Sequence, residues 1–442
     1  MSYPSLNVRN LGADSPGSSV FDLPTQPGQP QGTPSRRPSP AVGQTVEASH
    51  TETSFVVISG GTGCNSICSA FGHSACYILP VSDDGGSSSE IIRVLGGPSI
   101  GDIRSRLVRL IPPADPGSPL DAIRNLLAYR LPAKCTEQEA RDEWRDIVEG
   151  RSLLWAGIPN DRKEMIRAFL VHFEHEILSR AHKNFSFVNG SIGNYFLSAA
   201  QAFFRSLPSA IFLFSSITSS EANILPVIVT NHTVTIAAEL PPGISISSDE
   251  TLASPVDPLD GTLHRSRNVL FEAEGKDHYE PLNARITRLF YINAYGNEIH
   301  PSPNVDYLTS MSRYNILVYS SGSRSLKAKV LLLNSVNDRE TDGYTAVEYI
   351  RIIARTLNES HQPKTFGGLS KAETTYPISA FITHLVYLKG TGIEVDIPLI
   401  TQLGVRCIGV EGPMDERTKL PQFDASSINE AVREILESVT DE

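Results

Sequence analysis

The feature that most constrains the fold is an alternation of short apolar runs with polar, glycine-rich loops. The run FVVI at 55–58 is β-branched and aromatic, as in a buried strand, and the glycine-rich segment 60–63 follows it directly. Ile67 and Phe71 then recur at helical spacing, so the glycines lie at a strand-to-helix junction. A second apolar run at 76–81 ends in another polar loop. This order predicts an α/β fold with a mainly parallel sheet.

The same alternation continues to the end of the chain. Helices are expected at 141–148, 161–179, from Tyr195 onward, near 377–388 and at the C-terminal end, and strands at 288–292, 316–320, 330–333 and 405–410. The segment 224–240 is typical of a hairpin that turns near Asn231-His232.

One later helix has a clear amphipathic pattern. Its apolar face is formed by Val347, Ile350, Ala354 and Leu357. Thr345 and Glu348 have the spacing of a capping box, which predicts that this helix begins there.

The N-terminal segment 1–50 differs from the rest of the chain in composition. It is rich in Pro, Ser, Gly and Gln and lacks periodic apolar residues, so burial cannot offset the entropy of ordering it. We therefore expect a disordered tail followed by one α/β domain at 51–442.

The overall composition narrows the class of partner. With 442 residues, 40% of them hydrophobic, the chain can bury a sizeable core, and no segment has the roughly 20 apolar residues that span a bilayer. A net charge of −11 without a basic block argues against nucleic acid or anionic membranes as partners. The N-terminus lacks the apolar core of a secretory signal, so a cytoplasmic protein is expected.

The five cysteines predict reduced thiols rather than a disulfide framework, because they are odd in number and widely spread. Cys64, Cys68, His73 and Cys76 form the one local cluster that could ligate zinc. Their spacing matches no common zinc finger, which favours small buried residues over a metal site.

Four polar segments, at 60–63, 83–88, 101–104 and 189–194, carry the residues with functional chemistry. The segment 60–63 could close backbone N–H groups around a phosphate, although it lacks the lysine of a P-loop and the spacing of the dinucleotide fingerprint. Asp83 and Asp84 follow the second strand, where carboxylates can hold Mg²⁺ or orient a ribose or an attacking hydroxyl. The segment 101–104 combines a glycine, a carboxylate and Arg104, which can bind phosphate bidentately.

The four loops together resemble a known family. GGTG at 60–63, DDGGSS at 83–88, GDIR at 101–104 and N-x-S-I-G-N at 189–194 occur in its order and spacing. The family joins 2-phospho-L-lactate transferases with the bacterial gluconeogenesis-factor proteins and is often called CofD-like. The likeness runs from about 54 to 412, and the chain resembles a shortened eukaryotic member.

The resemblance implies a Rossmann-like fold, with helices on both faces of the sheet and a small hairpin element, and a nucleoside diphosphate derivative of GDP or UDP type as ligand. Asp83 and Asp84 would be the catalytic and Mg²⁺-binding residues. A homodimer is a further expectation. The residues that would contact the ligand are Gly60, Gly61, Thr62, Gly63, Gly85, Gly86, Ser87, Ser88, Gly101, Asp102, Arg104, Asn189, Ser191, Gly193, Asn194, Gly322 and Ser323.

The family contains two kinds of activity, and the sequence leaves both open. Transferase members move a phospholactyl group from a nucleoside diphosphate derivative to a hydroxyl acceptor, and regulatory members bind a UDP-sugar without turnover. Transferase chemistry is the first expectation, a regulator of carbon metabolism the second, and an inactive remnant the third.

The chain departs from the family pattern at two places, near 241–284 and 321–328. The strands on either side of the second gap are joined by too few residues for an ordinary parallel crossover, which needs a dozen or more. They either pair as an antiparallel hairpin or have lost the helix between them, and we favour the loss.

Overall fold

The computed structural model describes residues 53–60, 62–72, 75–82, 86–180, 183–239, 282, 284–318, 328–360, 375–416 and 419–440. These residues belong to one compact unit, Glu52–Glu442. The predicted tail and most of the 241–284 gap lie outside them.

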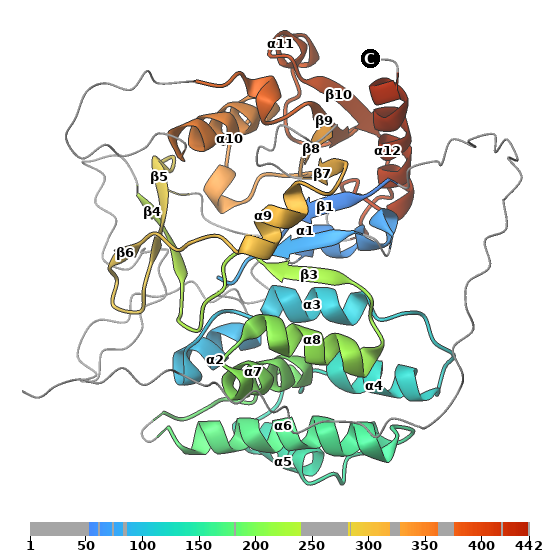
Figure 1. Ribbon diagram of the computed structural model, residues 1–442, viewed down its shortest axis with the longest axis vertical. Coiled ribbons are helices and arrows are strands. Elements are labelled where there is room, and N and C mark those ends of the chain that lie inside the picture. The colour runs from blue at the N-terminus through green and yellow to red at the C-terminus, as the bar shows by residue number, and fades with distance from the viewer. Residues whose placement is uncertain are drawn as a thin grey trace, which may run out of the picture. The chain divides into compact units, whose positions relative to one another are not determined.

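Seven parallel strands form the central sheet (Figure 1). In chain order they are β1 (Phe55–Ile58), β2 (Cys76–Leu79), β3 (Asn223–Pro226), β7 (Ile316–Val318), β8 (Ala328–Leu332), β9 (His384–Leu388) and β10 (Arg406–Val410). Their spatial order is β10-β9-β8-β7-β1-β2-β3, and every neighbouring pair is parallel. A separate antiparallel sheet contains β4 (Thr235–Glu239), β5 (Arg288–Ile292) and β6 (Glu298–Ile299).

Helices cover both faces of the central sheet. They are α1 (Thr62–Asn65), α2 (Gly86–Leu95), α3 (Gly101–Arg109), α4 (Pro119–Ala128), α5 (Glu137–Val148), α6 (Asn160–Leu178), α7 (Ile192–Phe204), α8 (Leu207–Thr218), α9 (Val305–Met311), α10 (Ala346–Ser360), α11 (Ile397–Gln402) and α12 (Ala425–Thr440). Single 3₁₀ turns are η1 (Cys68–Phe71), η2 (Leu153–Trp155), η3 (Arg339–Thr341) and η4 (Ile378–Ala380). The predicted α/β fold is confirmed.

Strand alternation explains how one sheet supports two layers of helices. Phe55 and Val57 of β1 belong to the apolar cluster that includes α12, whereas Val56 between them packs with Met311 of α9 on the other face. All three side chains are buried, as expected for a central parallel strand. Figure 1 shows α4 to α8 grouped together beyond β3, at one edge of the sheet.

The capping box predicted for the amphipathic helix is confirmed. The Glu348 backbone N–H donates to Thr345 Oγ1 at 3.3 Å, and the Thr345 backbone N–H donates to Glu348 Oε2 at 3.0 Å. The helix α10 begins directly afterwards.

The hairpin predicted in 224–240 is wrong. β3 pairs in parallel with β2, with Ile224 opposite Tyr77, whereas β4 pairs with β5 in the other sheet, with Ala237 opposite Phe290. Two apolar runs on either side of a polar turn have the same sequence pattern whether the two strands pair with each other or belong to different sheets.

The helix predicted near 377–388 is also wrong. Only the 3₁₀ turn η4 is helical there, and the rest is β9, which lies between β8 and β10. A short buried apolar run does not distinguish strand from helix by periodicity, and burial between two parallel neighbours decides for the strand.

The strands around the second gap are parallel. β7 pairs with β8 through Ile316 opposite Ala328, so the antiparallel hairpin alternative is wrong. The connection between them, including Gly322 and Ser323, lies outside the described residues.

An aromatic cluster fixes the helices beyond β3. Trp144 of α5 stacks on Phe187 with ring centroids 5.2 Å apart and meets the rings of Tyr195 and Phe173 edge-on at 5.1 and 5.9 Å. These rings tie α5 and α6 to α7, which begins within the predicted ligand-binding segment 189–194.

We expect Trp144→Ala to lower the free energy of unfolding by about 3–5 kcal/mol, because it leaves a cavity among packed rings. Urea unfolding followed by circular dichroism measures the change. Leu153→Ala, at a side chain that is 90% exposed, is the control. Equal midpoints for the two variants would contradict the packing role.

Candidate functional site

The chain leaves β1 through the first predicted loop. A Cβ atom added at Gly60 would lie 3.9 Å from Asp102 Oδ2, so this turn lies beside the start of α3. Thr62 and Gly63 open α1, and Gly61 lies outside the described residues. The helix predicted after Gly63 is interrupted, because α1 and the 3₁₀ turn η1 are separate.

The loop after β2 leads into α2. Asp83, Asp84 and Gly85 lie outside the described residues. α2 begins at Gly86, which has a φ of +53° in the left-handed region that favours glycine. Ser87 and Ser88, in the first turn of α2, are buried.

The segment before α3 returns to the end of β2. The Ser99 backbone N–H donates to the Val81 carbonyl at 2.8 Å, and α3 then starts with Gly101 and Asp102. This places the first turn of α3 at the carboxyl edge of the sheet, where open α/β folds bind ligands.

The segment before α7 is held against the end of α4. Leu131 N donates to Gly190 O at 2.8 Å and Ile192 N donates to Tyr129 O at 3.1 Å. A Cβ atom added at Gly193 would lie 2.3 Å from the Leu127 carbonyl, so only glycine allows this approach.

A single buried side chain joins the first turns of three helices. Asn194 of α7 accepts a hydrogen bond from Arg104 Nε of α3 at 2.8 Å and donates one to Ser87 Oγ of α2 at 2.8 Å. Its exposed fraction is 2%. Each helix N-terminus carries partial positive charge, so their meeting point favours an anion.

Two arginines add positive charge at this point. Burial, with the nearby charges of Arg130 and Arg109, lowers the pKa of Arg104 to about 10. Desolvation lowers the pKa of Arg130, whose Nη1 donates to the Asn189 carbonyl at 2.7 Å. Within the described ranges, neither Arg104 nor Arg130 has an acidic partner. A bound anion would offset this uncompensated charge.

A third arginine lies behind the glycine turn. Arg106 is fully buried; its Nη1 donates to Cys64 O at 3.0 Å and its Nη2 to Ser59 Oγ at 3.2 Å. The guanidinium lies 4.9 Å from the Tyr77 ring centroid, and its Nε has no hydrogen-bond partner among the described residues. The charge is therefore held by neutral groups directly beneath the turn.

Most of the described residues that the sequence predicts come together. The first turns of α2, α3 and α7 meet at the Asn194 side chain. Gly86 lies near Arg130, because a Cβ atom added at Gly86 would be 3.8 Å from Arg130 Nη1. Ser191 forms a backbone bridge with Arg130, and its buried hydroxyl has no partner in the described part of the chain. The predicted roles of these residues remain predictions.

Arg130 and Arg106 are functional candidates that the sequence pattern misses. Arg130 follows α4 with no motif around it. Arg106 had a detectable signal, because it lies on the same face of α3 as Ile103 and Leu107, where an apolar side chain is expected.

No metal site can be built from the described residues, among which no group of three or more His, Cys, Asp or Glu side chains could hold an ion. The predicted Mg²⁺ ligands, Asp83 and Asp84, and the His73 of the alternative zinc cluster lie outside them. All five cysteines are free, and burial raises the pKa of Cys76 to about 11.

Comparison with known proteins gives two matches in sequence. Residues 55–323 match the profile of the CofD family, described as 2-phospho-L-lactate transferase CofD. The chain is also 32% identical to the uncharacterized protein YNL011C of Saccharomyces cerevisiae over 428 residues, which cover 80% of this chain and 94% of the yeast protein. The resemblance seen in the sequence is confirmed.

The fold matches crystal structures of a Bacillus halodurans protein, BH3568, of the UPF0052 family. The TM-score is 0.53 at 16% identity in one structure and at 15% in another, with 86% of this chain covered in both and 99% or 100% of the bacterial protein. At this identity the likeness concerns the fold alone. In the described part of the chain, no helix is both long and apolar enough to cross a membrane.

We expect Gly193→Ala to destabilise the protein by about 1–3 kcal/mol, although alanine ordinarily stabilises a helix relative to glycine. The added methyl would meet Leu127 O at 2.3 Å and Arg104 Cδ at 3.0 Å. Thermal unfolding measures the loss. Gly392→Ala is the matched control because no atom lies within 4 Å of its added Cβ. A Gly193→Ala protein as stable as wild type would show that this approach is not required.

Proposed function

Because the chain belongs to the CofD family, we propose that it binds a nucleoside diphosphate derivative at the meeting point of α2, α3 and α7 and transfers a phospholactyl group from it to a hydroxyl acceptor. The observation that carries the proposal is the Asn194 bridge between Arg104 and Ser87. It fixes a cation and three helix N-termini around one point, a combination suited to the charge of a diphosphate.

In the proposed reaction the acceptor hydroxyl oxygen forms a bond to the phosphorus that carries the lactyl group. The bond from this phosphorus to the bridging oxygen breaks, and a nucleoside monophosphate leaves with the bond electrons. The hydroxyl proton passes to a carboxylate of Asp83 or Asp84, or to water. Arg104 and Arg130 would bind the phosphate oxygens on which negative charge develops.

Mg²⁺ would supply further neutralisation of phosphate charge when bound, and Asp83 and Asp84 would hold it. Carboxylates directly after a parallel strand fit this ion, since Mg²⁺ takes oxygen ligands and keeps several waters. Asn194 keeps Arg104 oriented whether or not the ion is present, because both of its hydrogen bonds are to protein groups.

We expect Arg104→Gln to weaken nucleoside diphosphate binding by about tenfold to a hundredfold, the loss typical of a hydrogen bond to a charged group. Isothermal titration with GDP and UDP-sugars, each with and without Mg²⁺, measures the affinity. Arg145→Gln is the control, since it removes the same charge from an exposed position of α5 and is not among the charges that act on Arg104. Equal affinities in the two variants would place the ligand elsewhere.

We expect Asp83→Asn and Asp84→Asn to abolish Mg²⁺-dependent release of the nucleoside monophosphate while leaving nucleotide binding measurable. Chromatography of the released nucleotide, with and without acceptor, follows the reaction. Binding without any release in the wild-type protein would favour the regulatory alternative, in which a nucleotide sugar is sensed. Absence of binding to every nucleotide would favour an inactive remnant.

A further inference from the structure

Two adjoining hollows lie at the opposite ends of α2 and α7 from the diphosphate site. Their volumes are about 370 and 420 Å³, and they share Leu95, Gly96 and Arg180 in their walls. We call the joint space, with Arg93, Lys183 and Arg205 also in its walls, the basic cleft. Volumes of this size suit small organic ligands.

The charges around the basic cleft are mostly positive. Of the described residues, Arg93, Arg180 and Lys183 line the first hollow, and no described Asp or Glu does. The second adds Arg205 and the imidazole of His232, with one carboxylate from Glu176. In a chain with a net charge of −11 this local excess of cations favours an anionic ligand.

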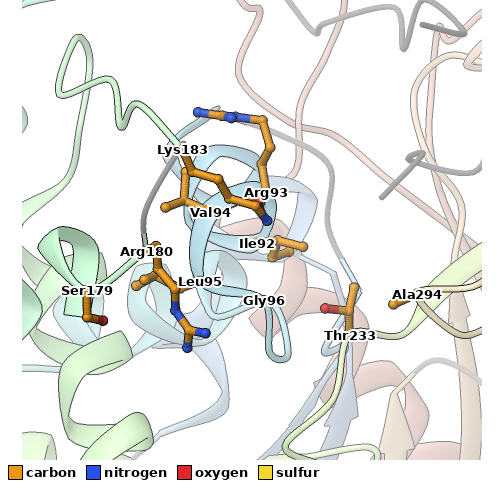
Figure 2. Close-up of a pocket in the computed structure, with 10 residues that line it drawn as sticks. All are labelled: Ile92, Arg93, Val94, Leu95, Gly96, Ser179, Arg180, Lys183, Thr233 and Ala294. Carbon is orange, nitrogen blue, oxygen red and sulfur yellow. Dashed lines mark hydrogen bonds between the residues drawn. The ribbon is translucent and has the colours of Figure 1, made fainter. Parts of the chain in front are cut away.

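Two of these cations, Lys183 and Arg93, make contacts within the protein. Lys183 Nζ donates to the Arg93 carbonyl at 2.9 Å near the C-terminus of α2, where a cation is favourable, and Arg93 pairs with Glu90 at 2.7 Å. Figure 2 shows Lys183 extending toward Arg93 of α2, with Arg180, which follows α6, beside Leu95. These contacts fix the wall of the cleft.

Arg180 and Arg205 are not explained in this way. The Arg180 guanidinium lies 3.8 Å from Glu176, at the long limit of an ion pair, and the Arg180 side chain is exposed to solvent, which weakens such a pair. The Arg205 side chain has no partner among the described residues. Two guanidinium groups thus remain to bind a ligand, one of them shared by both hollows.

The floor of the basic cleft, where the two hollows adjoin, is formed by the backbone of two glycines. Gly96 and Gly97 have φ values of +75° and +90°, which favour glycine. Cβ atoms added there would lie 3.8 Å from Thr233 Oγ1 and 3.7 Å from Gln201 Oε1. Neutral hydrogen-bonding groups therefore flank a floor that a ligand can approach closely.

We propose that the basic cleft binds a small organic anion with two charged groups, phosphate or carboxylate, placed on either side of Arg180. The cleft is separate from the diphosphate site. Asn194 and Gln201 lie on α7 about 10 Å apart along its axis, one at each site. α2 and α7 reach both sites, and the binding of an anion in the basic cleft does not rest on the proposed function.

The test measures binding of citrate and of inorganic phosphate to the full-length protein by isothermal titration, at ionic strength matched with sodium chloride. Arg180→Gln is expected to weaken the preferred anion at least about tenfold, and Arg205→Gln to weaken it in the same direction. Preference for citrate or phosphate distinguishes a carboxylate ligand from a phosphorylated one.

Two controls make the result specific. Arg145→Gln removes a guanidinium of comparable exposure, 53% against 49% for Arg180, and should leave binding unchanged. Arg151→Gln, at a side chain that is 58% exposed, should also leave it unchanged. Binding no stronger than that of chloride, or a loss in either control variant as large as in Arg180→Gln, would each overturn the proposal. If the protein bound no nucleotide but still bound the anion, the proposal for the basic cleft would stand.

Discussion

The two hydrogen bonds of the buried Asn194 side chain hold the site together. They connect α7 to α3 through Arg104 and to α2 through Ser87, and no solvent competes for them because the amide is almost fully buried. A buried amide without these partners would cost more than the bonds themselves contribute. The first turns of three helices therefore meet at one point only while this network is complete.

Parallel pairing brings these turns to the same edge of the sheet. β1 and β2 run side by side, with Val57 opposite Tyr77, so the loops that leave them emerge next to each other. The bond from Ser99 to Val81 then returns the chain to that edge before α3 begins. The geometry of the site follows from strand direction first and from side chains second.

The sequence predicted local structure best where the signal was local. Phe55 to Ile58 form a strand and Thr345 caps α10 because β-branched runs and capping boxes act within a few residues. Pairing was harder to predict. Whether the run at 224–226 joins β2 or folds back on the next strand depends on partners far along the chain, and so does the strand at 384–388.

That the polar segments meet could be predicted in outline because their glycines and polar residues stand in motifs. Gly193 and Asn194 belong to a recognisable sequence motif, and the structure places both in the first turn of α7 and gives each a specific contact. Arg130 and Arg106 were not predicted, since each acts through residues distant in sequence: Arg130 through Asn189, and Arg106 through Cys64 and Ser59. Arg130 carries no local signal, whereas Arg106 stands out only as a cation on the apolar face of α3.

Arg104 and Arg106 give a reason to expect that binding of an anion would stabilise this protein. Arg104 is held in its charged form at a cost in desolvation, which its depressed pKa reports, and Arg106 is buried with neutral partners alone. A diphosphate placed beside them would recover part of that cost only in the folded state. Its binding free energy then adds to the free energy of unfolding as the ligand concentration rises above the dissociation constant.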